Sequence, residues 1–363
     1  MSVPGAARQP LGKASVLARL AVIGLVLAAV GGTFVYLGGW LTPHDLTPAR
    51  FTDAFEHVDG LHAGFRRNHA KGVGVSGYFE GNGNGVRLSE AVVFRPGRVP
   101  VIGRFSLGGG QPYVGDGPEA VRGLGLQFSL PDGELWRTAM VNLPVFPVRT
   151  PEAFYQLLLT SQPDPGTGKP DPARMGAFLA RHPETVKAFA IIKSQPVSSG
   201  FGDSTFHGLN AFRFRNRAGD STPVRWVMTP MQPFEPASPG PLQGKNALFD
   251  ALIAAIHRQP LRWRLIVIVG QPGDPTNDAS VAWPAERQQV DVGTLTLDRV
   301  ESDDTSPAAS INFDPLVLPA GITPSDDPLP SARSAVYAQS FRRRVGEAKP
   351  SSAITPAEVG GGN

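Results

Sequence analysis

The sequence predicts an α+β fold that is built on an antiparallel sheet or barrel and preceded by one membrane-spanning helix. Short alternating apolar runs, separated by turns rich in Gly, Asn, Pro and Asp, occupy residues 73–141 and indicate antiparallel strands. Helical patterns follow them, and then further strands and a last helix, with no β-α-β repetition. Residues 20–43 carry no charged side chain, and this run precedes every other element.

Composition narrows the classes of protein and of site. The chain has 41% hydrophobic and 18% charged residues, which is typical of a globular protein. It contains no cysteine, so disulfides, thiolate metal sites, iron–sulfur clusters and cysteine nucleophiles are excluded. The net charge is +3 and no basic stripe interleaves with aromatic residues, so we expect no nucleic-acid partner.

The uncharged run 20–43 is long enough to cross a bilayer, because roughly 20 residues at ~1.5 Å each span the hydrocarbon core. Three basic residues precede it: Arg8, Lys13 and Arg19. Such residues stay on the cytoplasmic side, so we expect residues 1–19 to be cytoplasmic and the following domain to be exported to the periplasmic side. A cleaved signal peptide is the alternative, but its apolar core is usually only ~7–15 residues long. We therefore interpret the run as an uncleaved anchor in the lipid bilayer.

Residues 44–348 are predicted to form one mixed domain, which begins with a helical arm within 44–67. Strands are predicted over 73–79, 86–94, 99–107, 124–130, 135–141, 211–215, 224–229, 263–270 and near 292–297. Helices are predicted over 151–162, 172–181, 183–194 and 246–258. The Gly/Asn repeat at 81–85 is expected to be a hairpin turn, and residues 349–363 a flexible tail.

One histidine motif organises the candidate site. It reads Arg66-Arg67-Asn68-His69-Ala70-Lys71-Gly72, and a glycine-rich strand follows that ends in Tyr78-Phe79-Glu80. The glycines let the backbone lie flat against a bulky group. The histidine is then either a general base that faces a planar group or a hydrogen-bonded core residue. The segment resembles the distal-histidine segment of haem catalases, which implies that His69 is catalytic and that Arg66 helps to bind haem.

Two further motifs resemble the same family, in the same order. Arg104-Phe105-Ser106 resembles its Arg-Phe-Ser strand, which implies that Ser106 orients the ring of His69 and that Arg104 lies at a haem propionate. Asn142-Leu143-Pro144-Val145-Phe146 resembles its Asn-x-Pro-Val-Phe motif, which implies that Asn142 is the distal amide. Phe154 would then be the aromatic ring near a haem pyrrole.

The last motif supplies the other side of the site. Residues 333–346 resemble the family's proximal helix, in which Arg-x-x-x-Tyr is followed seven residues later by another Arg. Arg333 and Tyr337 share a helix face at i and i+4, and a guanidinium beside a phenol favours the phenolate form. The resemblance implies that Tyr337 ligates the haem iron and that Arg333 and Arg344 contact the haem. It covers roughly residues 45–346, which implies a catalase-like antiparallel barrel with surrounding helices.

Some positions depart from the family pattern. Asn68 stands where large catalases usually carry Val, and Pro147 and Thr150 replace a Phe and an Asp. Asn210 stands in place of a histidine on the proximal side. These departures alter the distal face and the channel wall.

The resemblance implies haem b as the cofactor and hydrogen peroxide as the substrate, with His69 moving a proton so that an oxoferryl intermediate forms. We expect a haem-dependent peroxidase that uses an organic electron donor, because the chain resembles in extent the short, exported catalase-related peroxidases. A minimal catalase, a lipid hydroperoxide-converting enzyme and a non-enzymatic haem-binding module are the alternatives. The oligomeric state stays open, and we expect no NADPH.

Overall fold

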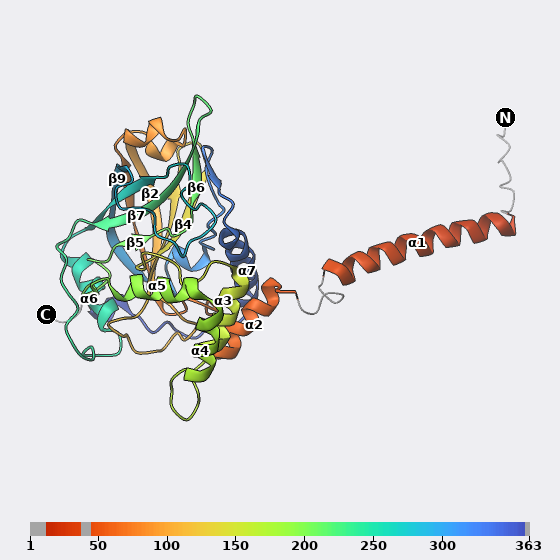
Figure 1. Cartoon of the computed structure of the whole chain (residues 1–363), viewed down its shortest axis with the longest axis horizontal. Helices are drawn as coiled ribbons and strands as arrows, with labels where there is room; N and C mark the ends of the chain where they lie inside the picture. Colours follow the sequence, from red (N-terminus) through yellow and green to blue (C-terminus); the bar gives the residue numbers. More distant parts are fainter. Residues whose placement is uncertain (1–11, 38–44, 360–363) are drawn as a thin grey trace, which may run out of the picture. The chain divides into compact units, whose positions relative to one another are not determined.

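The computed structural model describes residues 12–37 and 45–359 of the 363-residue chain, in two units, 1–47 and 48–363. The first unit holds helix α1 (Lys13–Leu37), drawn in red in Figure 1. Within Lys13–Tyr36, an 18-residue window has a mean hydropathy of 2.2 and no buried residues, so the helix is long and apolar enough to cross a membrane. A signal sequence near an N-terminus has the same features. The helix begins earlier than the predicted run, whose last residues, 38–43, lie outside the described residues.

The second unit is built on a closed antiparallel barrel of eight strands. In chain order they are β1 (Gly72–Gly81), β2 (Gly97–Leu107), β3 (Arg122–Ser129), β4 (Leu135–Val141), β5 (Phe206–His207), β7 (Ser221–Pro230), β8 (Leu261–Val269) and β9 (Gln289–Ser302). Each strand pairs with its neighbour in the order β7-β5-β4-β3-β2-β1-β9-β8, and pairing of β8 with β7 closes the ring. β6 (Phe212–Arg215) and β10 (Ile322–Pro324) extend the sheet from β7. The predicted antiparallel barrel is confirmed.

Aromatic side chains fill the barrel, because alternate residues of each strand point inward. Trp136 stacks on Phe128 with ring centroids 4.7 Å apart, and the edge of Trp226 meets Trp136 at 5.4 Å. All three side chains are buried. Truncating a buried aromatic ring of this kind typically costs ~3–5 kcal/mol of stability, so the barrel is the rigid part that positions the site.

A β-bulge opposite Ser76 and Gly77, where Asp298 is the extra residue, lets β9 bend while it pairs with β1. A Cβ on Gly77 would lie 2.0 Å from the main-chain oxygen of Thr296. Glycine is therefore required where the two strands approach, and the glycine run that follows the histidine motif serves barrel closure as well as the site.

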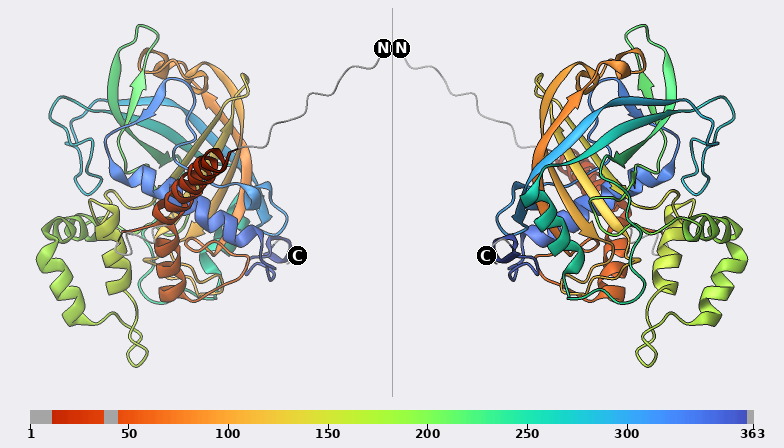
Figure 2. Two further views of the ribbon diagram at one scale, coloured as in Figure 1. Left: turned by 90° about the vertical axis from the view of Figure 1, so that its right-hand side faces the viewer. Right: turned by 90° about the vertical axis from the view of Figure 1, so that its left-hand side faces the viewer.

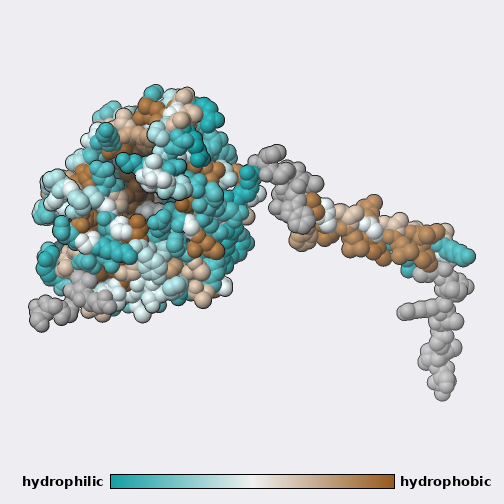
Figure 3. Space-filling model, turned by 90° about the horizontal axis from the view of Figure 1, so that it is seen from below, coloured by the Kyte–Doolittle hydropathy of each residue, from teal (hydrophilic) through white to brown (hydrophobic). Residues whose placement is uncertain are grey.

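The helices lie outside the barrel. They are α2 (Pro48–Asp59), α3 (Pro151–Thr160), α4 (Pro172–Arg181), α5 (Pro183–Lys193), α6 (Ala247–Arg258), α7 (Pro328–Val345) and α8 (Pro356–Val359). Thr150, Asp171 and Asp327 cap α3, α4 and α7, each with proline at the first helical turn. Figure 2 shows α3, α4 and α5 together, in yellow-green, beside the strands. Seen from below, the surface is largely hydrophilic, with a hollow in which apolar side chains lie (Figure 3).

The prediction of a strand at 86–94 is wrong. Two short 3-10 helices, Asn84–Arg87 and Val92–Phe94, occupy that stretch, and β1 pairs directly with β2 across the longer connection. The repeat at 81–85 is thus not a hairpin turn between adjacent strands. The apolar pattern has another cause: Val93 and Phe94 are buried in the main core.

The C-terminal residues also differ from the expected flexible tail. Ile354 is 2% exposed in the main core, and the main-chain nitrogen of Ser352 donates to Asp304. An apolar residue that can be buried offsets the entropy cost of ordering a polar segment. Residues 360–363 lie outside the described part of the chain.

Candidate active site

A large pocket lies between the barrel strands β2, β3 and β4 and helix α7. The space free of protein atoms within it is about 1350 Å³, including the part open to solvent. The predicted site residues that line it are Arg66, His69, Arg104, Ser106, Phe154, Arg333, Tyr337 and Arg344. Asn142 is not among the lining residues. The structure therefore brings together eight of the nine predicted side chains, although they come from segments that lie far apart in the sequence.

His69 lies in the segment between α2 and β1, with its backbone in the left-handed region at a φ of 56°. That conformation costs a non-glycine residue roughly 1–3 kcal/mol and persists only where surrounding contacts enforce it. The Asn68 side-chain oxygen accepts from the His69 main-chain nitrogen at 2.9 Å, and Arg104 donates to the His69 main-chain oxygen at 2.8 Å. The ring Nδ1 lies 3.1 Å from the Ser106 hydroxyl. Both the backbone and the ring are thus held.

Burial lowers the pKa of His69 from 6.5 to about 3, and the positive charges of Arg104, Arg333 and Arg66 lower it in the same direction. The imidazole is therefore neutral at neutral pH. A neutral ring can accept a proton from a bound molecule, which is what a general base requires.

Two glycines of β3 keep the pocket open beside this histidine. A Cβ on Gly123 would lie 2.8 Å from the Ser106 hydroxyl and 3.0 Å from the Nδ1 of His69. One on Gly125 would meet the ring of Phe313 at 2.8 Å. Any larger residue would displace these side chains, so the strand forms a flat wall.

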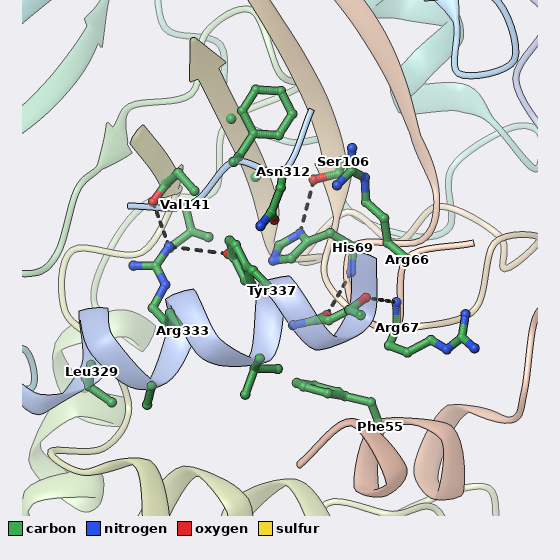
Figure 4. Close-up of a pocket in the computed structure, with 18 of the residues that line it drawn as sticks. Phe55, Arg66, Arg67, His69, Ser106, Val141, Asn312, Leu329, Arg333 and Tyr337 are labelled. Carbon is green, nitrogen blue, oxygen red and sulfur yellow. Dashed lines mark hydrogen bonds between the residues drawn. The ribbon is translucent and has the colours of Figure 1, made fainter. Parts of the chain in front are cut away.

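Across the pocket, Arg333 and Tyr337 lie on α7; the ring of Tyr337 lies next to His69, and Arg333 lies on the other side of Tyr337 (Figure 4). Arg333 donates to the phenol oxygen of Tyr337 at 3.4 Å and to the main-chain oxygen of Ala139 at 3.1 Å. The predicted i, i+4 pair is therefore formed, with the guanidinium next to the phenol.

A buried network holds Arg333 in place. Its other guanidinium nitrogen donates to the side-chain oxygen of Asn210 at 2.8 Å, and the amide nitrogen of Asn210 donates to Asp327 at 2.8 Å. Asn210 is 2% exposed. Asp327 also caps the start of α7, and burial raises the pKa of its carboxyl. The first turn of the helix thus fixes the guanidinium that contacts Tyr337.

Three arginines gather at one end of the pocket. Arg104 forms a salt bridge to Asp303 at 2.6 Å, while Arg66 donates to the main-chain oxygens of Ala308 and Ile311. Arg344 donates to a main-chain oxygen through one nitrogen, and its other terminal nitrogen is buried without a partner among residues 12–37 and 45–359. Burial and the neighbouring arginines lower the pKa of Arg66 and bring that of Arg344 to about 10. Burying such a cluster of positive charges lowers the stability of the folded protein unless an anion binds to it.

The remaining predicted residues take different positions. The ring of Phe154 lies 5.2 Å from that of Phe146 and 5.8 Å from that of Phe51, in the pocket wall. The Asn142 side-chain oxygen accepts from the main-chain nitrogen of Arg122 at 2.8 Å. Since a main-chain nitrogen only donates, this bond fixes which end of the amide is oxygen.

Sequence reasoning missed Asp303, which balances charge, and Phe313, which narrows the pocket. Asp303 pairs with Arg104 from 199 residues away, and nothing in the local sequence indicates that partner. Asn312 and Phe313 precede an Asp-Pro pair, a turn signal that says nothing about a pocket.

These features fit the haem that the resemblance implies. Arg66, Arg104 and Arg344 carry three positive charges against the single negative charge of Asp303, which leaves two in excess. Haem carries two carboxylates on a flat apolar body. The unpartnered nitrogen of Arg344 suits a haem carboxylate, and the flat wall of β3 suits the apolar body of the haem.

Comparisons with known proteins agree with this geometry. A family model described as Catalase matches residues 42–351. A catalase-related peroxidase of Synechococcus elongatus is 38% identical over 302 residues, covering 83% of this chain and 89% of that protein. One of Mycolicibacterium paratuberculosis is 33% identical over 304 residues, covering 83% and 96%. The crystal structure of a fungal catalase superposes with a TM-score of 0.71 at 19% identity, and the alignment covers 81% of this chain and 62% of that one.

Proposed function

The chain belongs to the catalase family, and we propose that it is a haem-dependent peroxidase. Its substrate is hydrogen peroxide or a small organic peroxide, which it reduces with an organic electron donor. It is an oxidoreductase that acts on peroxide. The observation that carries the proposal is one pocket in which the neutral His69, paired with Ser106, lies opposite Tyr337 and Arg333.

The proposed cofactor is haem b, with Tyr337 as the iron ligand. Arg333 stabilises the phenolate through its contact with the phenol oxygen. Arg66 and Arg344, with Arg104, would bind the two carboxylates, and Phe154 would pack against the apolar body. When bound, the haem supplies the iron that takes up peroxide and stores its oxidising equivalents.

The residues of the chain move the proton. His69 accepts a proton from one peroxide oxygen and delivers it to the other, so that this oxygen leaves as water. Ser106 fixes the ring through Nδ1, which leaves Nε2 for this transfer. Asn142 is the proposed amide donor, because its oxygen is already engaged by the main chain of Arg122.

We favour a peroxidase over a catalase because two relatives, of which the alignment covers 89% and 96%, are called catalase-related peroxidases. Disproportionation of hydrogen peroxide is the second candidate, favoured by membership of the catalase family itself. The two reactions differ in the molecule that reduces the oxidised enzyme: an organic donor in a peroxidase and a second hydrogen peroxide in a catalase.

A side-by-side assay tests this proposal. The haem-loaded protein is given equal peroxide, first alone and then with a bulky phenol or dye. We expect donor oxidation to outpace oxygen evolution. Fast oxygen evolution with an unoxidised dye would identify a catalase instead, and no reaction with either would exclude both.

We also propose that α1 anchors the protein in the membrane with the catalytic domain on the exported, periplasmic side. The uncharged stretch between Arg19 and the end of α1 supports this. The full chain should stay with membranes after an alkaline carbonate wash and keep its N-terminal residues by mass spectrometry. A mature protein that begins after the helix would show a cleaved signal sequence.

A further inference from the structure

We propose that Asn68 is a positioning residue for His69. Its side-chain oxygen holds the left-handed backbone of His69 and thereby sets the direction of the imidazole in the pocket. The inference rests on the acid–base role proposed for His69 and extends it to a residue that the family resemblance marks only as a departure.

Two main-chain nitrogens donate to the one oxygen of the Asn68 side chain. They belong to His69, at 2.9 Å, and to Gly109, at 2.8 Å. Because main-chain nitrogens only donate, the amide must present its oxygen to both. The side chain therefore bridges the histidine segment and the glycine turn that follows β2.

The bridge matters because of the backbone at His69. Its φ of 56° lies in a region that a residue with a β-carbon rarely adopts unless contacts enforce it. Arg104 holds the carbonyl on the C-terminal side of this residue, and Asn68 holds the amide on the N-terminal side. Loss of the Asn68 oxygen would leave that amide without its partner, and relaxation to an ordinary φ would turn the ring away from Ser106.

The glycine turn is shaped to receive the bridge. Gly109 has a φ of 100° and also accepts a hydrogen bond from the main-chain nitrogen of Ala70 at 3.0 Å. A Cβ on Gly110 would lie 2.7 Å from the main-chain oxygen of Arg67. The turn thus packs closely against residues 67–70, so that a small movement of Asn68 also moves the backbone of His69.

The side-chain nitrogen of Asn68 could act separately from the oxygen, by contacting a molecule in the pocket. Asn68 is among the residues that line the pocket, and within the described ranges its nitrogen has no hydrogen-bond partner. Valine, which large catalases usually carry here, fills similar space but offers neither the acceptor nor the donor. Aspartate keeps the acceptor for both main-chain nitrogens, loses the donor and adds a negative charge. Comparing these substitutions separates positioning from direct contact.

Three variants test the inference: Asn68→Ala, Asn68→Val and Asn68→Asp. Asn82→Ala is the matched control, because the Asn82 side-chain oxygen also accepts from a main-chain nitrogen, that of Asn84, at an exposed site. Hydrogen exchange of the His69 main-chain amide is measured in the haem-free protein. In the haem-loaded protein the readout is the association rate of cyanide, which binds as an anion after a base has taken its proton.

We expect the His69 amide to be protected in the wild type and to exchange at least about 10-fold faster in Asn68→Ala and Asn68→Val. Cyanide association should fall about 10- to 100-fold in both, since misplacement of a catalytic group by ~1 Å costs about that much. Asn68→Asp should stay within about threefold of the wild type in hydrogen exchange of the His69 amide, which reports on the main-chain hydrogen bond.

Other outcomes overturn the inference. An unprotected His69 amide in the wild type, or unchanged values in Asn68→Ala and Asn68→Val, would show that the oxygen does not hold the backbone. Hydrogen exchange in Asn68→Asp as fast as in Asn68→Ala would show that an acceptor at this position does not hold the His69 amide. Wild-type protein that binds no haem would refute the proposed function, while hydrogen exchange would still decide whether Asn68 positions His69.

Discussion

The hydroxyl of Ser106 lies 3.1 Å from the Nδ1 of His69. The serine is on β2, in the rigid barrel, while the histidine lies in an irregular segment with a left-handed backbone. The barrel therefore holds the Nδ1 side of the ring, in addition to the contacts that hold the His69 backbone, and the proposed proton transfer falls to the opposite ring nitrogen.

Replacement of His69 by Ala should leave haem binding intact and slow the reaction with peroxide. The proposed iron ligand is on α7, so the haem content and Soret band should not change. Groups that act as general acid and base contribute typically ~10²–10⁴ in rate, and stopped-flow absorption at the Soret band should show a loss in that range. His257→Ala is the control, because His257 is exposed. An unaffected rate in His69→Ala would move the acid–base role to another group.

The stability of the haem-free protein should fall in acid, partly because of His69. Its pKa is lowered from 6.5 to about 3 in the folded state, so the unfolded chain binds a proton that the folded one does not. The contribution of His69 to stability is complete above about pH 6.5 and is lost as the pH falls toward 3. A pKa that differs by one between the folded and unfolded states changes the free energy of unfolding by about 1.4 kcal/mol.

Chemical denaturation at a series of pH values measures this loss, and His69→Gln should flatten the curve between about pH 6.5 and 3. His207, whose pKa burial lowers to about 4, adds a dependence of the same sign that the substitution leaves in place. An identical pH dependence in the wild type and in His69→Gln would contradict the lowered pKa.

Local patterns predicted much of this fold. The helix 172–181 and the strand 135–141 have the predicted bounds, because proline and capping residues or tight turns mark their ends. The same reasoning was wrong for residues 86–94. Burial of Leu88, Val93 and Phe94 in the core requires apolar residues in this stretch, and their presence there mimics the apolar content of a strand.

The candidate site was predictable where one motif held the residues, as in the spacing of Arg333 and Tyr337. It was not predictable where two residues far apart in the sequence contact each other only after the chain has folded. Asp303, which follows β9, meets Arg104 of β2 only because β9 and β2 pair with opposite edges of β1. The role of Asn68 depends on a φ angle and on a glycine turn about 40 residues away, and no local pattern encodes either.

Replacement of Arg344 by Leu should weaken haem binding without changing the iron ligand. Its unpartnered terminal nitrogen is the donor best placed for a carboxylate, and a hydrogen bond to a charged group contributes about 1.5–3 kcal/mol. We expect roughly a 10- to 100-fold rise in the haem dissociation constant, measured by titration of haem-free protein. Arg342→Leu, on an exposed face of the same helix, should bind as the wild type does. Equal affinities of Arg344→Leu and Arg342→Leu would place the haem carboxylates elsewhere.

Replacement of Tyr337, the proposed ligand of the haem iron, is the most direct test, because the proposed chemistry requires haem bound at this residue. The full chain in detergent is prepared as the wild type, as Tyr337→Phe and as the control Tyr78→Phe, whose ring lies on β1 against Arg98. Haem content per chain and the ferric absorption spectrum are then compared. We predict that the wild type and Tyr78→Phe hold haem with a high-spin ferric spectrum and that Tyr337→Phe loses most of it. Full haem occupancy with an unchanged spectrum in Tyr337→Phe would contradict the account.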